Sequence, residues 1–124
     1  KLNTKHMREA CQYLIGRHDF SSFRASSCQS SNPVRDMISI ELEVDKFISI
    51  RFTANAFLHH MIRNIVGTLL DVGAEKISPK DLRRILHAKD RNAASKTASA
   101  EGLYLARVNY PEKYAFPYHA NEMI

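Results

Sequence analysis

Apolar residues recur at helical spacing along one long segment of the chain, from Ala56 to Val72. Leu58, Met61, Ile62, Ile65, Leu69 and Val72 are three or four positions apart, which places them on one face of a helix. Arg63 interrupts this apolar stretch, and a guanidinium in such surroundings needs an acceptor for its charge. We therefore predict a helix over about residues 56–72, ended by Gly73, that holds Arg63 against a partner.

Two shorter segments alternate between apolar and polar residues, which is the period of a β-strand. The apolar positions are Ile38, Ile40, Leu42 and Val44 in the first segment, and Ile48, Ile50, Phe52 and Ala54 in the second. Asp45 and Lys46 make a tight connection between them, so we predict an antiparallel hairpin. Because one face is apolar and the other polar, helices should cover one side of the sheet.

Two further helices are predicted, one on each side of these elements. The first is capped by Asn3 or Thr4 and is ended by Gly16 at the C′ position, and it buries Met7, Ala10, Cys11 and Leu14. The second opens on the capping pair Ser78-Pro79, runs to about residue 88, and turns Leu82, Ile85 and Leu86 inward. One predicted helix therefore precedes the hairpin, and the other follows the helix at 56–72.

The remaining segments are predicted to be mostly loops. Asp19 caps a short turn at 20–23, residues 26–32 and 90–102 form loops, and residues 103–108 form a last strand before a tail at 112–124. Helices and strands do not alternate as in βαβ units. The predicted class is therefore α+β, with an antiparallel or mixed sheet and helices packed on one face, in a single domain over residues 1–124.

The charge and the cysteines narrow the possible partners and the compartment. The 124 residues include 18 Lys+Arg and 13 Asp+Glu, for a net charge of +5. Such a domain suits a nucleic acid, although ordinary surface charge explains the number equally well. Cys11 and Cys28 form no metal or redox motif, which favours a reducing cytoplasm. No signal peptide and no apolar run of the roughly 18 residues needed for a membrane span are visible.

The common catalytic motifs do not occur in the sequence. His59 and His60 are adjacent, so they point about 100° apart on a helix and make no metal site by themselves. The patterns GxSxG, GxxxxGK[ST] and GxGxxG are absent. The residues alone therefore indicate a basic α+β domain with one notable arginine.

Four stretches together resemble the tRNA pseudouridine synthase A family. They are residues 18–25 (HDFSSFRA), 55–67 (NAFLHHMIRNIVG), 89–91 (KDR) and 100–105 (AEGLYL). Their order and spacing match the C-terminal half of such an enzyme over about residues 4–114. The resemblance implies isomerisation of uridine to pseudouridine in the anticodon stem-loop of tRNA. It also implies a cytoplasmic enzyme, homodimeric at full length, that needs no cofactor and no metal.

The resemblance also implies roles for particular residues. Arg63 matches the arginine that pairs with the catalytic aspartate, and Leu103 matches an apolar residue that packs against the target uracil. A guanidinium would keep that carboxylate ionised and oriented, and a base taken out of its stack needs an apolar surface. The basic candidates for phosphate contacts are Arg24, Arg35, His59, Lys89, Arg91 and Lys96, of which Arg24, His59 and Arg91 are the predicted substrate-binding residues.

The family's nucleophilic aspartate lies in a segment that reads Arg-Thr-Asp-x-Gly-Val-His, and residues 1–124 contain no such segment. The chain also begins with Lys1. We therefore expect a piece of a longer enzyme whose N-terminal domain supplies the aspartate, and an isolated chain that makes no pseudouridine. The alternative is a stand-alone RNA-binding or assembly module that reuses the fold without chemistry.

Overall fold

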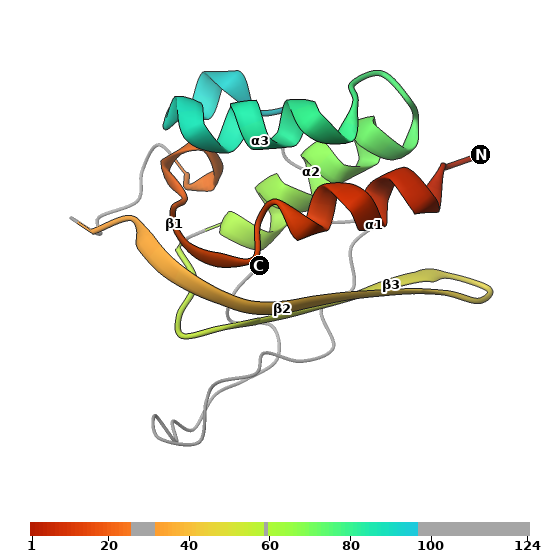
Figure 1. Ribbon diagram of the computed structural model, residues 1–124, viewed down its shortest axis with the longest axis horizontal. Coiled ribbons are helices and arrows are strands. Elements are labelled where there is room, and N and C mark those ends of the chain that lie inside the picture. Colours follow the sequence, from red (N-terminus) through yellow and green to blue (C-terminus); the bar gives the residue numbers. More distant parts are fainter. Residues whose placement is uncertain (26–31, 59, 97–124) are drawn as a thin grey trace.

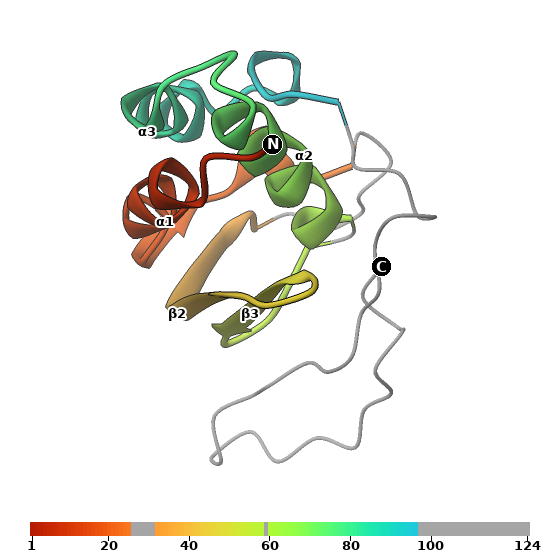
Figure 2. The same ribbon diagram turned by 90° about the vertical axis from the view of Figure 1, so that its right-hand side faces the viewer.

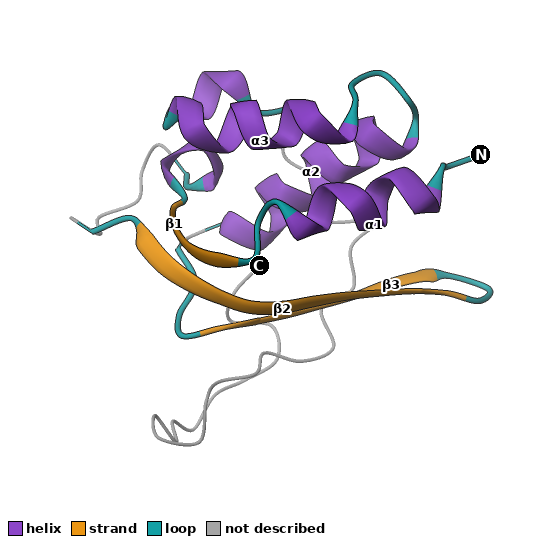
Figure 3. Ribbon diagram, viewed as in Figure 1, coloured by secondary structure: helices purple, strands orange, loops and turns teal. Residues whose placement is uncertain are grey.

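Three helices lie on one face of a three-stranded sheet in the computed structural model, which describes residues 1–25, 32–58 and 60–96 (Figure 1). The elements are α1 (Thr4–Gln12), β1 (Gly16–Asp19), β2 (Val34–Val44), β3 (Ile48–Ala54), α2 (Met61–Gly73) and α3 (Pro79–Ala88), with short 3-10 helices η1 (Ser21–Phe23) and η2 (Arg91–Ala93). Figure 3 shows the helices and the sheet as two separate layers. The predicted α+β class, with helices on one face, is confirmed. The predicted strand at 103–108 and the tail at 112–124 lie outside the described residues.

The sheet is antiparallel in the order β1-β2-β3, and β1 is the strand that the sequence did not predict. The prediction that Gly16 ends α1 is wrong, because α1 ends at Gln12 and Tyr13 caps it. Gly16 instead opens β1 with a φ of +107°, a conformation that glycine adopts without strain. Four residues are too few to show a strand period, so this strand depends on pairing with β2 for its definition.

The hairpin formed by β2 and β3 is confirmed, but the prediction that Ile38 shares a face with Ile40 and Leu42 is wrong. The ladder shifts register between Met37 and Ser39. Such a bulge adds one residue to one strand and reverses the facing of the side chains beyond it. Met37 is therefore 1% exposed, whereas Ile38 is 50% exposed. Val44 lies at the end of the hairpin, next to the exposed Phe47, and is itself exposed.

The central helix α2 begins five residues later than predicted, at Met61 instead of about residue 56. His60 precedes it with a φ of 59°, in the left-handed region that a right-handed helix does not allow. Leu58 stays buried although it is outside the helix, and its carbonyl accepts a 3.0 Å hydrogen bond from Met61 N. The apolar spacing thus identified the buried residues correctly but did not locate the start of the helix.

The two flanking helices have the predicted caps. Asn3 Oδ1 accepts a 3.0 Å hydrogen bond from His6 N at the start of α1. Ser78 and Asp81 form a reciprocal capping box at the start of α3. The predicted inward residues Leu82, Ile85 and Leu86 are buried. In the part of the chain that the structure describes, no helix has the length and apolar character needed to cross a bilayer.

Gly73, the last residue of α2, allows α1 to approach closely. A Cβ at this position would lie 2.7 Å from Met7 Sδ and 3.1 Å from Leu2 Cδ2. Asn3 N donates a 2.7 Å hydrogen bond to the carbonyl of Gly73. This contact fixes the C-terminal end of α2 against the N-terminal end of α1, and Figure 2 shows α1 and α3 stacked on one side of α2.

Candidate functional site

Arg63 lies in the first turn of α2, where it is half-buried between the buried neighbours Ile62 and Asn64. The first turn of α2 contains no acidic residue. The N-terminal end of a helix carries a partial positive charge, and the guanidinium adds a full positive charge to it. This end of α2 is therefore electropositive and suits an anionic group such as a carboxylate or a phosphate.

Asn64 fixes the first turn of α2 to the neighbouring segments. Its side chain is 1% exposed, and its Nδ2 donates a 2.7 Å hydrogen bond to the carbonyl of Phe23. Its Oδ1 accepts a 3.1 Å hydrogen bond from Arg91 Nη2. One buried amide thus joins α2 to η1 and to η2, and it does so beside Arg63.

A second contact one turn further along α2 holds the segment that follows η2. Thr68 Oγ1 accepts a 3.2 Å hydrogen bond from Ser95 N. The carbonyl of Ser95 in turn accepts a 3.0 Å hydrogen bond from Arg91 Nη1. Residues 91–95 are therefore fastened along α2, with the Arg91 guanidinium bridging Asn64 and Ser95.

Ser22 makes the third connection in this network. The serine is fully buried, its Oγ donates a 2.6 Å hydrogen bond to the carbonyl of Ile85, and it accepts a 2.9 Å hydrogen bond from Asp90 N. The stretches 18–25, 55–67 and 89–91 are far apart in the sequence. The structure brings all three together around the start of α2.

The charged groups at the edge of this network surround Asp19. Burial alone would raise the pKa of Asp19, but hydrogen bonds from Ser21 and the nearby charges of Lys89 and Arg24 outweigh it and hold the pKa below its ordinary value. The backbone hydrogen bond from Ser21 N to Asp19 Oδ1 measures 2.8 Å. Two of the predicted basic candidates, Arg24 and Lys89, therefore lie close enough to act on one carboxylate.

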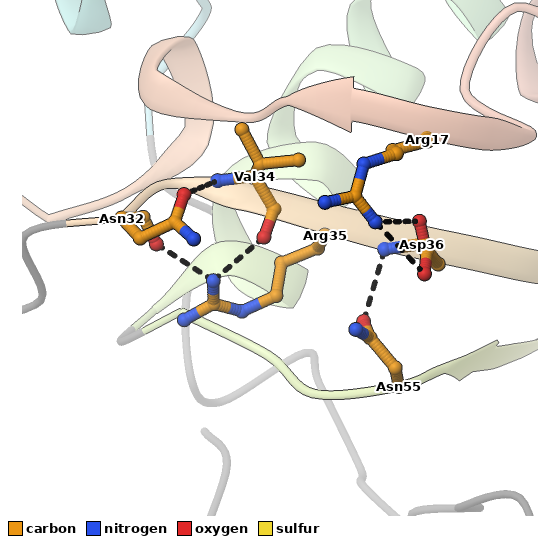
Figure 4. Close-up of polar contacts among 6 residues, drawn as sticks. All are labelled: Arg17, Asn32, Val34, Arg35, Asp36 and Asn55. Carbon is orange, nitrogen blue, oxygen red and sulfur yellow. Dashed lines mark hydrogen bonds and ion pairs between the residues drawn. The ribbon is translucent and has the colours of Figure 1, made fainter.

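Asn55, which the sequence analysis did not single out, sets the path of the chain from β3 towards α2. Its Oδ1 accepts a 2.9 Å hydrogen bond from Asp36 N (Figure 4). Its own N donates a 3.1 Å hydrogen bond to the carbonyl of Asp36. The Asp36 carboxylate pairs with Arg17 at 3.2 Å. This end of the sheet is thereby joined to the segment that carries Arg63.

Arg35, another basic candidate, makes local contacts at the start of β2. Its Nη1 donates hydrogen bonds of 2.7 Å to the carbonyl of Asn32 and 2.8 Å to the carbonyl of Val34 (Figure 4). Lys96 is exposed. His59 and Leu103 lie outside the described residues, so their predicted contacts stay predictions. Among the described residues, no three or more His, Cys, Asp or Glu side chains gather where they could share a metal ion.

The polar residues that build this site were the ones sequence reasoning missed. Asn64 had a visible signal, because a carboxamide within a largely apolar helix must find hydrogen-bond partners when it is buried. Ser22 and Thr68 had none, because short hydroxyl side chains are common both in loops and in helices. Their partners are 27 to 68 positions away.

Residues 10–111 match a family model described as tRNA pseudouridine synthase. The chain therefore belongs to the tRNA pseudouridine synthase family. The matched stretch includes α2 and Arg63. Curated relatives named tRNA pseudouridine synthase A are similar to it. Those from Chromobacterium violaceum and Vibrio campbellii are 49% identical over 117 and 118 residues, and the one from Paraburkholderia phymatum is 50% identical over 117. These alignments cover 94% of this chain and 44–45% of the relatives, so the chain spans less than half of their length.

Proposed function

We propose that this chain is the C-terminal part of a tRNA pseudouridine synthase that isomerises uridine to pseudouridine in the anticodon stem-loop of tRNA. The observation that carries the proposal is the family match over residues 10–111, which contains Arg63 in a firmly held first turn of α2. The partial coverage of the relatives supports a further inference, that another part of the complete enzyme supplies the nucleophilic aspartate.

In the proposed enzyme, Arg63 pairs with the carboxylate of that aspartate. The isomerisation breaks the bond from the ribose to N1 of uracil and forms a bond from the same ribose carbon to C5; C5 loses its proton to solvent and N1 takes up a proton. A carboxylate nucleophile must be ionised and aimed at the substrate, whether it attacks the ribose or the ring. The guanidinium lowers the pKa of the carboxylate by its charge and fixes its orientation by a two-pronged hydrogen bond. The network through Asn64 supports this role because it restrains the turn on which Arg63 lies.

The other predicted site residues complete the proposal. Leu103 packs against the displaced uracil, and Arg24, His59 and Arg91 lie along the phosphate backbone of the tRNA. Arg91 also has an internal role, because Nη1 and Nη2 donate to Ser95 and Asn64. The complete enzyme acts in the cytoplasm as a homodimer, without a metal or a cofactor.

The test measures release of tritium from tRNA labelled at C5 of uridine. The complete enzyme should release tritium, and the isolated chain should not. Arg63→Ala in the complete enzyme should lower the single-turnover rate about a hundredfold or more, because an electrostatic contact of this kind contributes about 3 kcal/mol. Arg63→Lys should also fail, because a point charge cannot reproduce the two-pronged pair.

Two outcomes would contradict the proposal. If the complete protein binds tRNA but releases no tritium, the non-catalytic RNA-binding module is the better description. If the Arg63→Ala variant melts at a lower temperature yet reacts at the normal rate per folded molecule, Arg63 anchors the helix and does not serve the chemistry. Measuring tRNA affinity and thermal melting on the same preparation separates these results.

A further inference from the structure

A basic groove runs between the C-terminal end of α1 and the outer face of α3. It has a volume of about 650 Å³ and is lined by Tyr13, Lys80, Arg83, Arg84, His87 and Ala88. The four basic side chains are exposed, and none of the lining residues is acidic. Asp81 pairs with Arg84 at 3.4 Å from outside the groove. The groove therefore concentrates positive charge, with one carboxylate beside it to offset one of its cations.

The fold holds these basic side chains on one face of α3. Leu82, Ile85 and Leu86 are buried in the core, so the opposite face of α3 has to point outward. The basic positions 80, 83, 84 and 87 lie on that face, because the pairs 80/83, 80/84, 83/87 and 84/87 are three or four residues apart. With a rise of 1.5 Å per residue, Lys80 and Arg83 are about 4.5 Å apart along the helix axis, and Arg83 and Arg84 are about 1.5 Å apart. Like charges at this spacing repel one another, and a partner with regularly spaced negative charges relieves the repulsion.

We infer that this groove binds the phosphodiester backbone of RNA, as a contact surface additional to the site around Arg63. A guanidinium presents a fork of donors that matches phosphate oxygens, and a lysine adds a point charge. The lining contains no large aliphatic side chain that would enter a lipid surface. In Figure 2, α1 and α3 lie to one side of α2, away from its first turn. The groove therefore holds a part of the RNA other than the reacting uridine, and the identity of that RNA as tRNA rests on the proposed function.

The test compares two variants of this chain that lose the same charge. Lys80→Gln/Arg83→Gln removes two cations from the groove. Lys5→Gln/Lys46→Gln removes two exposed lysines that do not line it and is the matched control. The affinity for unmodified tRNA is measured by filter binding across a range of salt concentrations, and circular dichroism confirms that both variants are folded.

The groove variant should bind tRNA about tenfold more weakly than the wild type at roughly 0.1 M salt. The slope of log affinity against log salt should become shallower by about 2, since each lost phosphate contact removes about one unit. The control should stay within about twofold of the wild type, with a slope close to the original. Equal affinities and slopes for the two variants would overturn the inference.

A second arm uses a poly-glutamate peptide in place of tRNA. If the groove variant no longer binds the peptide but still binds tRNA with the wild-type affinity, the groove recognises acidic protein segments and the RNA inference is wrong. The outcome for the proposed function is separate. If the groove variant weakens tRNA binding while the complete enzyme releases no tritium, the RNA surface stands and the catalytic proposal fails.

Discussion

Replacing Asn64 with alanine should destabilise the fold more than any other single polar substitution in the network around α2. The amide is buried, and its side chain donates a hydrogen bond to the carbonyl of Phe23 at 2.7 Å and accepts one from Arg91 Nη2 at 3.1 Å. The substitution leaves the buried carbonyl without this donor and removes an acceptor from a charged group. It therefore acts on both η1 and η2.

The magnitude follows from these two contacts. A buried carbonyl that is left without a hydrogen-bond donor costs roughly 1–3 kcal/mol, and a hydrogen bond to a charged group contributes roughly 1.5–3 kcal/mol. Arg91 is only half-buried, so water recovers part of the second contribution. We expect Asn64→Ala to lower the free energy of unfolding by about 2–4 kcal/mol. For a domain of this size, that corresponds to a fall in Tm on the order of 10 °C.

Urea unfolding followed by circular dichroism is the suitable assay, because the chain contains no Trp and its fluorescence signal is weak. The midpoint should fall while the slope of the transition stays the same. Asn92→Ala is the matched control, since Asn92 is an exposed residue of η2 and its loss should change stability by less than about 0.5 kcal/mol. A loss for Asn64→Ala as small as that of the control would refute the reasoning. The double variant with Arg91→Ala should show a coupling energy of about 0.5–3 kcal/mol.

Two further predictions test the electrostatics and the register of the sheet. The folded-state pKa of Asp19 is lowered, so its contribution to stability is present above its ordinary pKa of about 3.9 and is lost as the pH falls through the lower folded value. Asp19→Asn should therefore flatten the acid limb of the curve of stability against pH. An unchanged limb would argue against the effect. Ile40→Thr should cost about 1–3 kcal/mol because Ile40 is buried, whereas Ile38→Thr should cost less than about 0.5 kcal/mol; the reverse order in urea melts would show that the bulge is misplaced.

The sequence by itself determined the parts of this protein that depend on near neighbours. The helical spacing around Ile65 and the alternation from Ile48 to Ala54 follow from which side chains must avoid water, so the main helix and the hairpin were predictable. The caps at Asn3 and Ser78 are contacts over three residues, and a local contact can be read from a local pattern. The four stretches that resemble the tRNA pseudouridine synthases identified the family in the same way.

Tertiary structure decided the features that depend on distant partners. The strand β1 has too few residues for a period of its own and is defined by its pairing with β2. The bulge after Met37 exposes an isoleucine that alternation alone would bury. The left-handed His60 sets the start of α2, although nothing in its neighbours indicates that conformation.

In the candidate site too, the sequence determined one part and tertiary structure decided the rest. Arg63 stood out in the sequence because a charge within an apolar run needs a partner. The residues that hold its helix turn did not, since Asn64 meets Phe23 across 41 positions and Arg91 across 27. The basic groove likewise joins Tyr13 to a helix that begins more than sixty residues later. A hydrogen bond or a shared surface between such distant segments exists only after the core has packed, because its geometry is fixed by the positions of the helices and not by the spacing of the residues along the chain.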